Sequence, residues 1–430
     1  MYQRWPFLPL HTLTPEQNSA WWDSCFAPLP TLESFVAGEG SAALLTGPGN
    51  GKSTALAALK RRQTKNCLLV SYPLENWPGG PHPWLPGQGH VSQIMAAAAT
   101  SVVDILNTWP DRFAQLNTLQ QEFLAWLINK HLGRRTLARL SHHLAQSIVG
   151  LALPNSTASD LYPGDTNESD VWGQIGELVE LAQSLGYQRV LVLAEIDQFR
   201  LVKYAGDLRT LFGRSSLMEH PGWALKLALP YSHELQTQIA GGSGGRLHIH
   251  RLHLEMDVIH EIVGRYLQVA TDNRFTHLAA LASDAVIERA MQEINGLYGE
   301  PSLAGWLGWA ETLLMLWSSS NTLVRVNDTE KALAAFYSRY VPLHLIEGQN
   351  GIWRGPQFLP LDSQPLEIMR KLFALRGGSA PDALLDLART GENLNTIVSR
   401  LRKIIEPLKG QSVYIQNRRD RGYWLENFVD

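Results

Sequence analysis

The segment Thr46-Gly-Pro-Gly-Asn-Gly-Lys-Ser-Thr54 limits the possible folds of this 430-residue chain more than any other feature. An apolar run at 42–45 precedes it, and a segment of helical character at 55–62 follows it. Glycines let successive backbone N–H groups turn toward one point, and the first turn of a helix adds the positive end of its dipole. A strand, a glycine-rich turn and a helix in this order are typical of a parallel sheet covered by helices. The segment therefore predicts an α/β fold with a phosphate-binding loop.

These nine residues resemble the Walker A motif of P-loop ATPases, with Thr46 at the place of the motif's first glycine. The resemblance implies that Lys52 reaches the β- and γ-phosphates of a nucleotide and that Ser53 gives a hydroxyl ligand to Mg²⁺. It implies Mg²⁺ and a nucleoside triphosphate as cofactors. We take the nucleotide to be ATP, although the motif itself fits GTP equally well. The other nucleotide-binding positions that it implies are Gly47, Gly49, Asn50, Gly51 and Thr54.

A second run, Val190-Leu-Val-Leu-Ala-Glu-Ile-Asp197, is predicted to be a buried strand that ends in two acids. It resembles the Walker B strand of AAA+ and STAND ATPases, in which Asp-Glu follows four apolar residues. The resemblance implies that Glu195 is the general base that activates water, and that Asp197 takes over part of the metal's outer coordination shell. Ala194 stands where the resemblance requires the magnesium-orienting aspartate, which predicts slow or impaired ATP hydrolysis.

The AAA+ resemblance continues through a predicted helix at 203–217 and a strand at 223–229. Ser232 is the polar residue nearest to the strand tip where the family places its sensor-1 residue. Arg246 stands where the family often places an arginine finger, and an ordinary surface arginine is the alternative for this position. Tyr298-Gly-Glu-Pro-Ser302 resembles the Gly-x-Pro-Arg segment of AAA+ lids, with Ser302 in the sensor-2 position. These replacements favour a slow nucleotide switch over a processive motor.

The pattern of apolar and polar residues changes along the chain and divides it into three predicted domains. Residues 1–255 form a P-loop ATPase domain with a helical insert at about 91–153, residues 256–345 an all-α lid, and residues 346–430 a winged helix. The strands expected in the first domain are 42–46, 66–72, 189–194, 223–229 and 247–252. The predicted fold class is thus α/β, a P-loop NTPase parallel sheet followed by a helical lid and a C-terminal winged helix.

The last part of the chain is basic. Residues 351–430 carry twelve basic and nine acidic residues, whereas the whole chain has a net charge of −3. A helix is expected at 393–406 because Leu394, Val398, Leu401 and Ile405 form one apolar stripe. Such a helix leaves polar side chains free to read base edges and hold phosphates, and a basic hairpin after it suits a groove of DNA. The predicted DNA-binding residues are Asn395, Ser399, Arg400, Arg402, Lys403, Arg418, Arg419 and Arg421.

This C-terminal segment resembles the OmpR/PhoB-type winged-helix effector domain of bacterial response regulators. The resemblance is carried by Asn395-Thr-Ile-Val-Ser-Arg-Leu-Arg-Lys, Arg421-Gly-Tyr-Trp-Leu and the opening strand Gly351-Ile-Trp-Arg. It implies a DNA-binding domain. The alternative is a packing module, because winged helices also occur in that role in STAND and AAA+ proteins.

Composition excludes several classes of protein. Only Cys25 and Cys67 are present, which excludes a disulfide scaffold and a multi-cysteine metal site. Four histidines between 248 and 260 invite a metal hypothesis, but no acid or cysteine completes a ligand set, so structural roles are favoured. The sequence has no 18-residue apolar stretch and no signal-peptide pattern, so we expect a cytoplasmic protein without membrane contact.

Three functions fit these observations. The first is a transcriptional regulator in which ATP controls DNA binding by the winged helix. The second is a STAND-like defence or signalling ATPase, whose helical insert senses an unknown protein partner and whose winged helix is structural. The third is an ATPase that loads proteins onto DNA for replication or transposition and binds DNA without sequence preference. DNA is the expected partner, and self-association on ATP binding is a further expectation.

Overall fold

The computed structural model describes residues 7, 9–13, 19–77, 89–144, 168–380, 394–418 and 422–429. The chain forms two compact units. The sheet unit comprises Pro28–Thr46 and Gly51–Leu252, and the helical unit comprises Met1–Ala27, Gly47–Asn50 and His253–Asp430. The three-domain division made at 255 and 345 stays a prediction.

The core of the sheet unit is a parallel sheet of five strands, in the order β2-β3-β4-β1-β5. This confirms the predicted α/β class. All five expected strands are present, with ends that differ from the predicted ones by at most one residue. The strands are β1 (Ala42–Thr46), β2 (Cys67–Ser71), β3 (Arg189–Glu195), β4 (Trp223–Pro230) and β5 (His248–Leu252). Because all strands run the same way, the residues that follow β1 and β3 emerge at one edge of the sheet.

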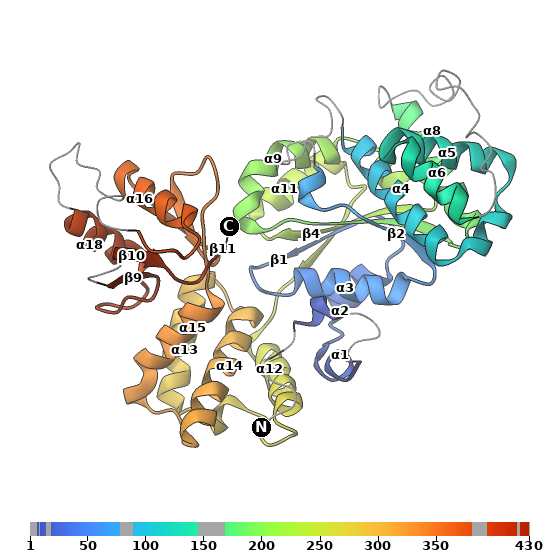
Figure 1. The fold of residues 1–430 in the computed structure, drawn as a ribbon. Helices are drawn as coiled ribbons and strands as arrows, with labels where there is room; N and C mark the ends of the chain where they lie inside the picture. The colour runs from blue at the N-terminus through green and yellow to red at the C-terminus, as the bar shows by residue number, and fades with distance from the viewer. Residues whose placement is uncertain are drawn as a thin grey trace. The chain divides into compact units, whose positions relative to one another are not determined.

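Helices cover the sheet, with α2 and α3 on one side and α9 and α11 on the other (Figure 1). The bounds are α2 (Pro30–Ala37), α3 (Lys52–Gln63), α8 (Glu168–Ser184), α9 (Gln198–Phe212), α10 (Ser216–Glu219) and α11 (His233–Ser243). The helix predicted at 203–217 was misplaced. It begins five residues earlier and ends at Phe212, where Gly213 closes α9 by donating its N–H to the carbonyl of Arg209.

The helical insert shares a core with the sheet rather than forming a core of its own. Its described helices are α4 (His90–Thr108), α5 (Thr118–Leu132) and α6 (Arg134–His143), and the predicted part beyond Leu144 lies outside the described residues. Ile94 and Met95 of α4 belong to the same buried cluster as Leu68 of β2. His90 joins the insert to the sheet unit, since Tyr72 Oη lies 2.9 Å from its Nδ1 and the carbonyl of Asp207 lies 2.7 Å from its Nε2.

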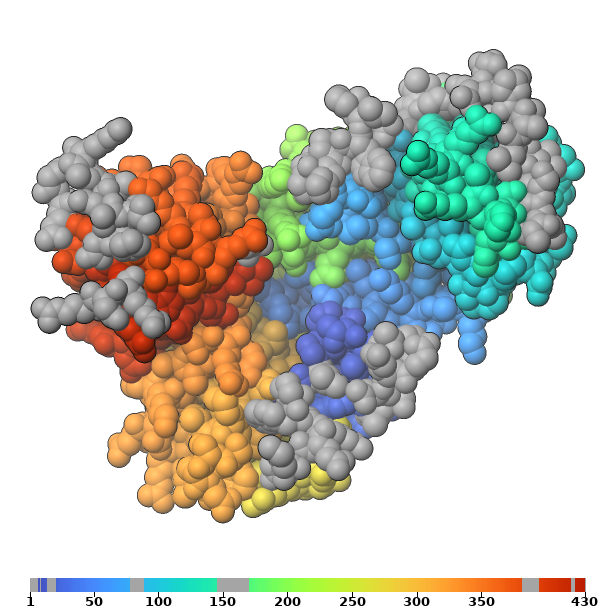
Figure 2. Space-filling view, viewed as in Figure 1, coloured from blue at the N-terminus to red at the C-terminus, as the bar shows by residue number. Residues whose placement is uncertain are grey.

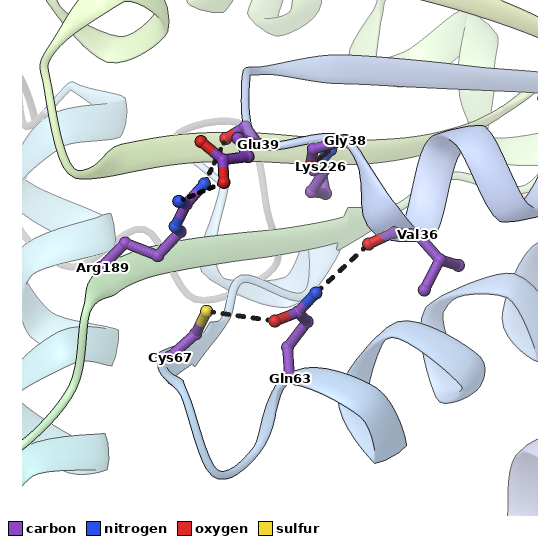
Figure 3. A network of polar contacts seen from close by, with 7 residues as sticks. All are labelled: Val36, Gly38, Glu39, Gln63, Cys67, Arg189 and Lys226. Atoms are coloured by element: carbon purple, nitrogen blue, oxygen red, sulfur yellow. Dashed lines mark hydrogen bonds and ion pairs between the residues drawn. The ribbon is translucent and has the colours of Figure 1, made fainter.

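Lys226 is a buried cation in the middle of β4, only 1% exposed. Its Nζ donates to the carbonyls of Phe35 and Gly38, which end α2, and lies 5.3 Å from the centre of the Phe35 ring. Figure 3 shows Lys226 and Gly38 near the Arg189–Glu39 ion pair. Burial, together with the smaller effect of the Arg189 charge, lowers the pKa of Lys226 from its ordinary 10.5 to about 8.

The Lys226 side chain is predicted to make a contribution to stability that grows in alkaline solution. Between pH 8 and 10.5 the unfolded chain holds the Lys226 proton and the folded chain releases it, so the contribution of this group to the free energy of unfolding rises with pH. We expect a rise of about 1–3 kcal/mol from this group, measured by urea unfolding at both ends of that range. Lys226→Met should lose this rise, whereas Lys65→Met, which changes an exposed lysine, should keep it. An equal rise in both variants would contradict the prediction.

The helical unit is built from α1 (Ser19–Cys25), α12 (Met256–Ala270), α13 (Asp284–Tyr298), α14 (Leu303–Ser320) and α15 (Thr329–Tyr340). Trp306 and Trp309 of α14 are fully buried, and the Trp309 ring packs edge-on against Phe336 of α15. Trp306 and Trp309 therefore lie in the core of this bundle.

The C-terminal module completes the helical unit. It contains a sheet of order β11-β6-β7-β8, two described helices and the hairpin of β9 and β10. The bounds are β6 (Leu343–His344), β7 (Gly351–Arg354), β8 (Gln357–Pro360), α16 (Ser363–Ala374), α18 (Leu394–Ile405), β9 (Ile415–Arg418), β10 (Gly422–Leu425) and β11 (Phe428–Val429). These elements are consistent with the expected winged helix.

Hydrogen bonds fasten the C-terminal module to the end of α15. Asn427 Nδ2 donates to the carbonyl of Tyr337 at 2.8 Å, and Tyr414 Oη donates to the carbonyl of Val341 at 2.7 Å. Strand β11 also pairs with β6, which directly follows α15. Figure 2 shows the red module in continuous contact with the orange helices of the same unit. The module and the helical bundle are thus joined by several independent contacts.

Candidate nucleotide site

The glycine-rich segment forms the predicted turn between β1 and α3. Gly49 and Gly51 have φ values of +74° and +94°, a region that side-chain-bearing residues rarely adopt. Gly51 occupies the N-cap position of α3 and has no side chain to cap it. The first N–H groups of a helix have no partner within the helix, so those of α3 are open to an anion.

The acids of β3 lie beside the start of α3. Ser53 Oγ donates a hydrogen bond of 2.7 Å to Glu195 Oε1, which joins α3 to the last residue of β3. Burial lowers the pKa of the half-buried Lys52, and the charges of Asp197 and Glu195 oppose this shift. One cation, one hydroxyl and two carboxylates therefore converge within the sheet unit.

The same acids border a cavity of about 280 Å³ in the sheet unit. Lys60 and Arg200 contribute cations to its wall, and Arg200 pairs with Glu75 at 3.4 Å. The lining residues are Leu56, Lys60, Ser71, Tyr72, Pro73, Leu74, Glu75, Leu193, Glu195, Asp197 and Arg200. Solvent and small solutes can thus reach Glu195 and Asp197 from this side.

These residues fit a nucleotide with Mg²⁺ in their chemistry. Mg²⁺ takes oxygen ligands, and Ser53 and Glu195 place a hydroxyl and a carboxylate together. Ala194 is buried in β3 and offers only a methyl group, so Glu195 is the acid of this strand that contacts Ser53. The sequence located Ser53 and Glu195 on separate motifs, but it gave no signal that the two side chains are hydrogen-bonded. The base role assigned to Glu195 stays a prediction.

Ser302 and Ser232 both begin helices. Ser302 Oγ accepts from the N–H of Gly305 at the start of α14 and donates to the carbonyl of Pro48 in the phosphate loop. Ser232 Oγ accepts from the N–H of Leu235 and so caps α11.

Arg246 is exposed, and its Nε donates to Glu219 Oε1 at 2.8 Å. The finger role of Arg246 stays a prediction.

The histidines of 248–260 occupy separate environments. His250 packs edge-on against Phe35, His260 packs edge-on against Trp306, and His253 lies 3.7 Å from Glu300. Within the described ranges, no group of three or more His, Cys, Asp or Glu could hold a metal ion. The structural role of these histidines stays a prediction.

Helix α18 buries its predicted apolar stripe and also Ile397. Asn395, Ser399, Arg400, Lys403 and Arg418 are exposed. Arg402 is partly buried, donates to the carbonyl of Ile415 at 2.9 Å and lies 5.8 Å from the centre of the Tyr423 ring. Asn395 Oδ1 accepts from Tyr423 Oη at 2.8 Å. Arg419 and Arg421 lie outside the described residues, and DNA contact stays a prediction for the whole set.

Comparisons with known proteins add little to this geometry. No family model matches the chain, and no curated protein matches it. Among solved structures, a point mutant of RuvB from Thermotoga maritima aligns over 92% of this chain and 88% of its own, with 11% identity and a TM-score of 0.30. In the described ranges, no helix is long and apolar enough to cross a membrane.

Proposed function

We propose that the protein is an ATP-dependent switch of the AAA+/STAND type, whose C-terminal winged helix binds DNA and regulates transcription. The observation that carries the nucleotide part is the hydrogen bond from Ser53 to Glu195 beside Lys52, at the end of a glycine-rich turn between a parallel strand and a helix. The AAA+ assignment rests on the sequence resemblance together with the parallel sheet.

The chain's own groups would bind the nucleotide as follows. The amides at the start of α3 and the Lys52 ammonium group would hold the phosphates, which carry most of the ligand's charge. Ser53 would hold Mg²⁺, and Glu195 would fix the Ser53 hydroxyl in the direction of the metal. Bound Mg²⁺ would neutralise charge on the phosphate oxygens. Glu195 would also act as the base that activates water, and Asp197, two residues further and close enough to affect the pKa of Lys52, would take over part of the metal's outer coordination shell.

The DNA part of the proposal is supported by charge. Arg400, Lys403 and Arg418 are exposed basic residues on the predicted recognition helix and hairpin of a module with an excess of basic residues. Selection of genomic fragments by the full-length protein, with and without ATP and Mg²⁺, tests the function directly. Enrichment of a few sites that depends on ATP is the expected result. Binding without sequence preference, or no binding in either condition, would contradict a regulator.

The double variant Arg400→Ala with Lys403→Ala should weaken DNA binding by about tenfold or more and flatten its salt dependence. Each phosphate contact releases counterions, so two lost contacts should lower the slope of log K against log salt by roughly 2. Fluorescence anisotropy over a salt series measures both quantities. Arg370→Ala, which removes one positive charge from the exposed face of α16 outside the predicted recognition helix, is the control and should leave the slope unchanged. An unchanged slope in the double variant would show that α18 is not the helix that contacts DNA.

A second candidate is the STAND-like signalling ATPase with a structural winged helix. The observation that favours it is the internal use of Arg402 and Asn395, two residues expected to face DNA. This candidate predicts that ATP causes self-association of the protein without any DNA preference. It also predicts a protein partner for the helical insert, which a cross-linking experiment with α4–α6 residues would detect.

A further inference from the structure

The outer side of the phosphate loop is hydrogen-bonded to the first turn of α14 within the helical unit. The Asn50 carboxamide makes two of these bonds, since Nδ2 donates to the carbonyl of Pro301 and Oδ1 accepts from the N–H of Leu303, both at 2.9 Å. The N–H of Ala304 donates to the carbonyl of Gly49 at 3.0 Å. With the Ser302–Pro48 bond at 3.1 Å, four hydrogen bonds form what we call the loop latch.

The loop latch supplies most of the capping of α14. A helix begins with four N–H groups that have no partner in the helix. In α14, Leu303 and Ala304 donate to the phosphate loop, and Gly305 donates to Ser302 Oγ. Asn50 and Ser302 are 2% and 0% exposed, so water cannot replace these bonds. The start of α14 therefore depends on the conformation of the loop.

The conformation of the phosphate loop also depends on the start of α14. The C=O of one residue and the N–H of the next point in opposite directions across a planar trans peptide. Because Ser302 holds the carbonyl of Pro48, the N–H of Gly49 points away from α14. A Cβ on Gly49 would lie 2.5 Å from Ser302 Oγ and 2.8 Å from the Ala304 methyl, so this position has room only for glycine. The first turn of α14 thus sets the direction of a loop amide.

We infer that Asn50 and Ser302 are positioning residues, which orient the phosphate loop and make the start of α14 respond to bound nucleotide. The inference rests on the proposed nucleotide site. Coupling between two sites is reciprocal in free energy, so a nucleotide that binds the latched loop more tightly than the unlatched loop also stabilises the start of α14. The C-terminal module lies in the same compact unit, packed on α15 through Tyr337 and Val341. The loop latch is therefore the first step of a route from nucleotide to that module.

The test compares amide hydrogen exchange at 303–305 in the full chain, with and without ADP and Mg²⁺, while calorimetry measures ADP binding. In the natural protein, ADP should change the exchange rate of Leu303 and Ala304 by about tenfold or more. In Ser302→Ala, that nucleotide-dependent change should fall below about twofold, and ADP affinity should fall by about five- to tenfold. Asn50→Ala should lose the change as well.

Asn117→Ala is the matched control, because Asn117 Oδ1 accepts from the N–H of Gln120 and caps α5 in the insert. It removes the same carboxamide and the same kind of bond, but it should leave ADP affinity and the response of 303–305 unchanged. Ser302→Thr, which keeps the hydroxyl, should restore the response.

The outcomes separate this inference from the proposed function. Absence of ADP and ATP binding in the natural protein would overturn the proposed function and the inference with it. Nucleotide binding with unchanged exchange at 303–305 would overturn the inference alone. An undiminished response in both Ser302→Ala and Asn50→Ala would overturn it too.

Discussion

Lys52→Ala is expected to lower the affinity for ATP by about a hundredfold or more, because no other cation of the phosphate loop can reach the β- and γ-phosphates. The Lys52 side chain is half-buried next to Glu195 and Asp197. Removing its charge leaves the two carboxylates to repel the phosphates, which adds to the loss of the direct contact. Binding of a fluorescent ATP analogue measures the effect.

The control for Lys52→Ala is Lys65→Ala, an exposed lysine just beyond α3. It makes the same change in net charge and should bind ATP like the natural protein. Thermal unfolding of both variants without nucleotide should show that each is folded. If Lys52→Ala binds ATP with natural affinity, then the nucleotide does not bind at this loop.

Glu195→Gln is expected to reduce ATP hydrolysis by about 10²–10³-fold while ATP binding is largely kept. The amide oxygen of glutamine can still accept the hydrogen bond from Ser53, so the variant removes the charge and little of the geometry. The measurement is phosphate release at saturating ATP, together with ATP affinity.

Asp197→Asn is the matched partner of Glu195→Gln and decides between two roles for the acids. If Glu195 is the base, only Glu195→Gln should stop hydrolysis. If Glu195 serves to orient Ser53 and Asp197 orients water, then Asp197→Asn should lower turnover while Glu195→Gln weakens the dependence on Mg²⁺. Natural turnover in both variants would show that neither acid takes part. If the natural protein binds ATP but does not hydrolyse it, the result would agree with the impaired hydrolysis predicted from Ala194.

The elements of the sheet could be predicted because each strand carries a local signal. The apolar run at 42–45 ends at Thr46-Gly47 and the apolar run at 190–194 ends at Glu195, and the structure has β1 and β3 there. The helix predicted at 203–217 was misplaced because its first turn, Gln198-Phe-Arg-Leu201, alternates polar and apolar residues, which is not the spacing that indicates a helix. Local patterns thus predicted the existence of the elements better than their ends.

The pairings within the site could not be predicted in the same way. Ser53 and Glu195 are 142 residues apart, and Asn50 and Pro301 are 251 residues apart. No composition or spacing rule connects residues over such distances, since the contact depends on how the sheet and the helical bundle fold. The resemblance to AAA+ lids drew attention to Ser302 as a replaced arginine, and the structure gives it a different task as a cap that also holds the loop.

The separation of Asn50 from Pro301 has a consequence for the newly made protein. At 5–20 residues per second, a ribosome needs roughly 10–50 s to make the intervening chain. All five strands of the parallel sheet are complete by Leu252, so the sheet can form while the partners of the loop latch are not yet synthesised. During that interval the glycines leave the phosphate loop flexible, because the residues of α14 that hold it through the loop latch have not been made. A nascent chain therefore acquires its sheet first and its final loop geometry only after α14 has emerged.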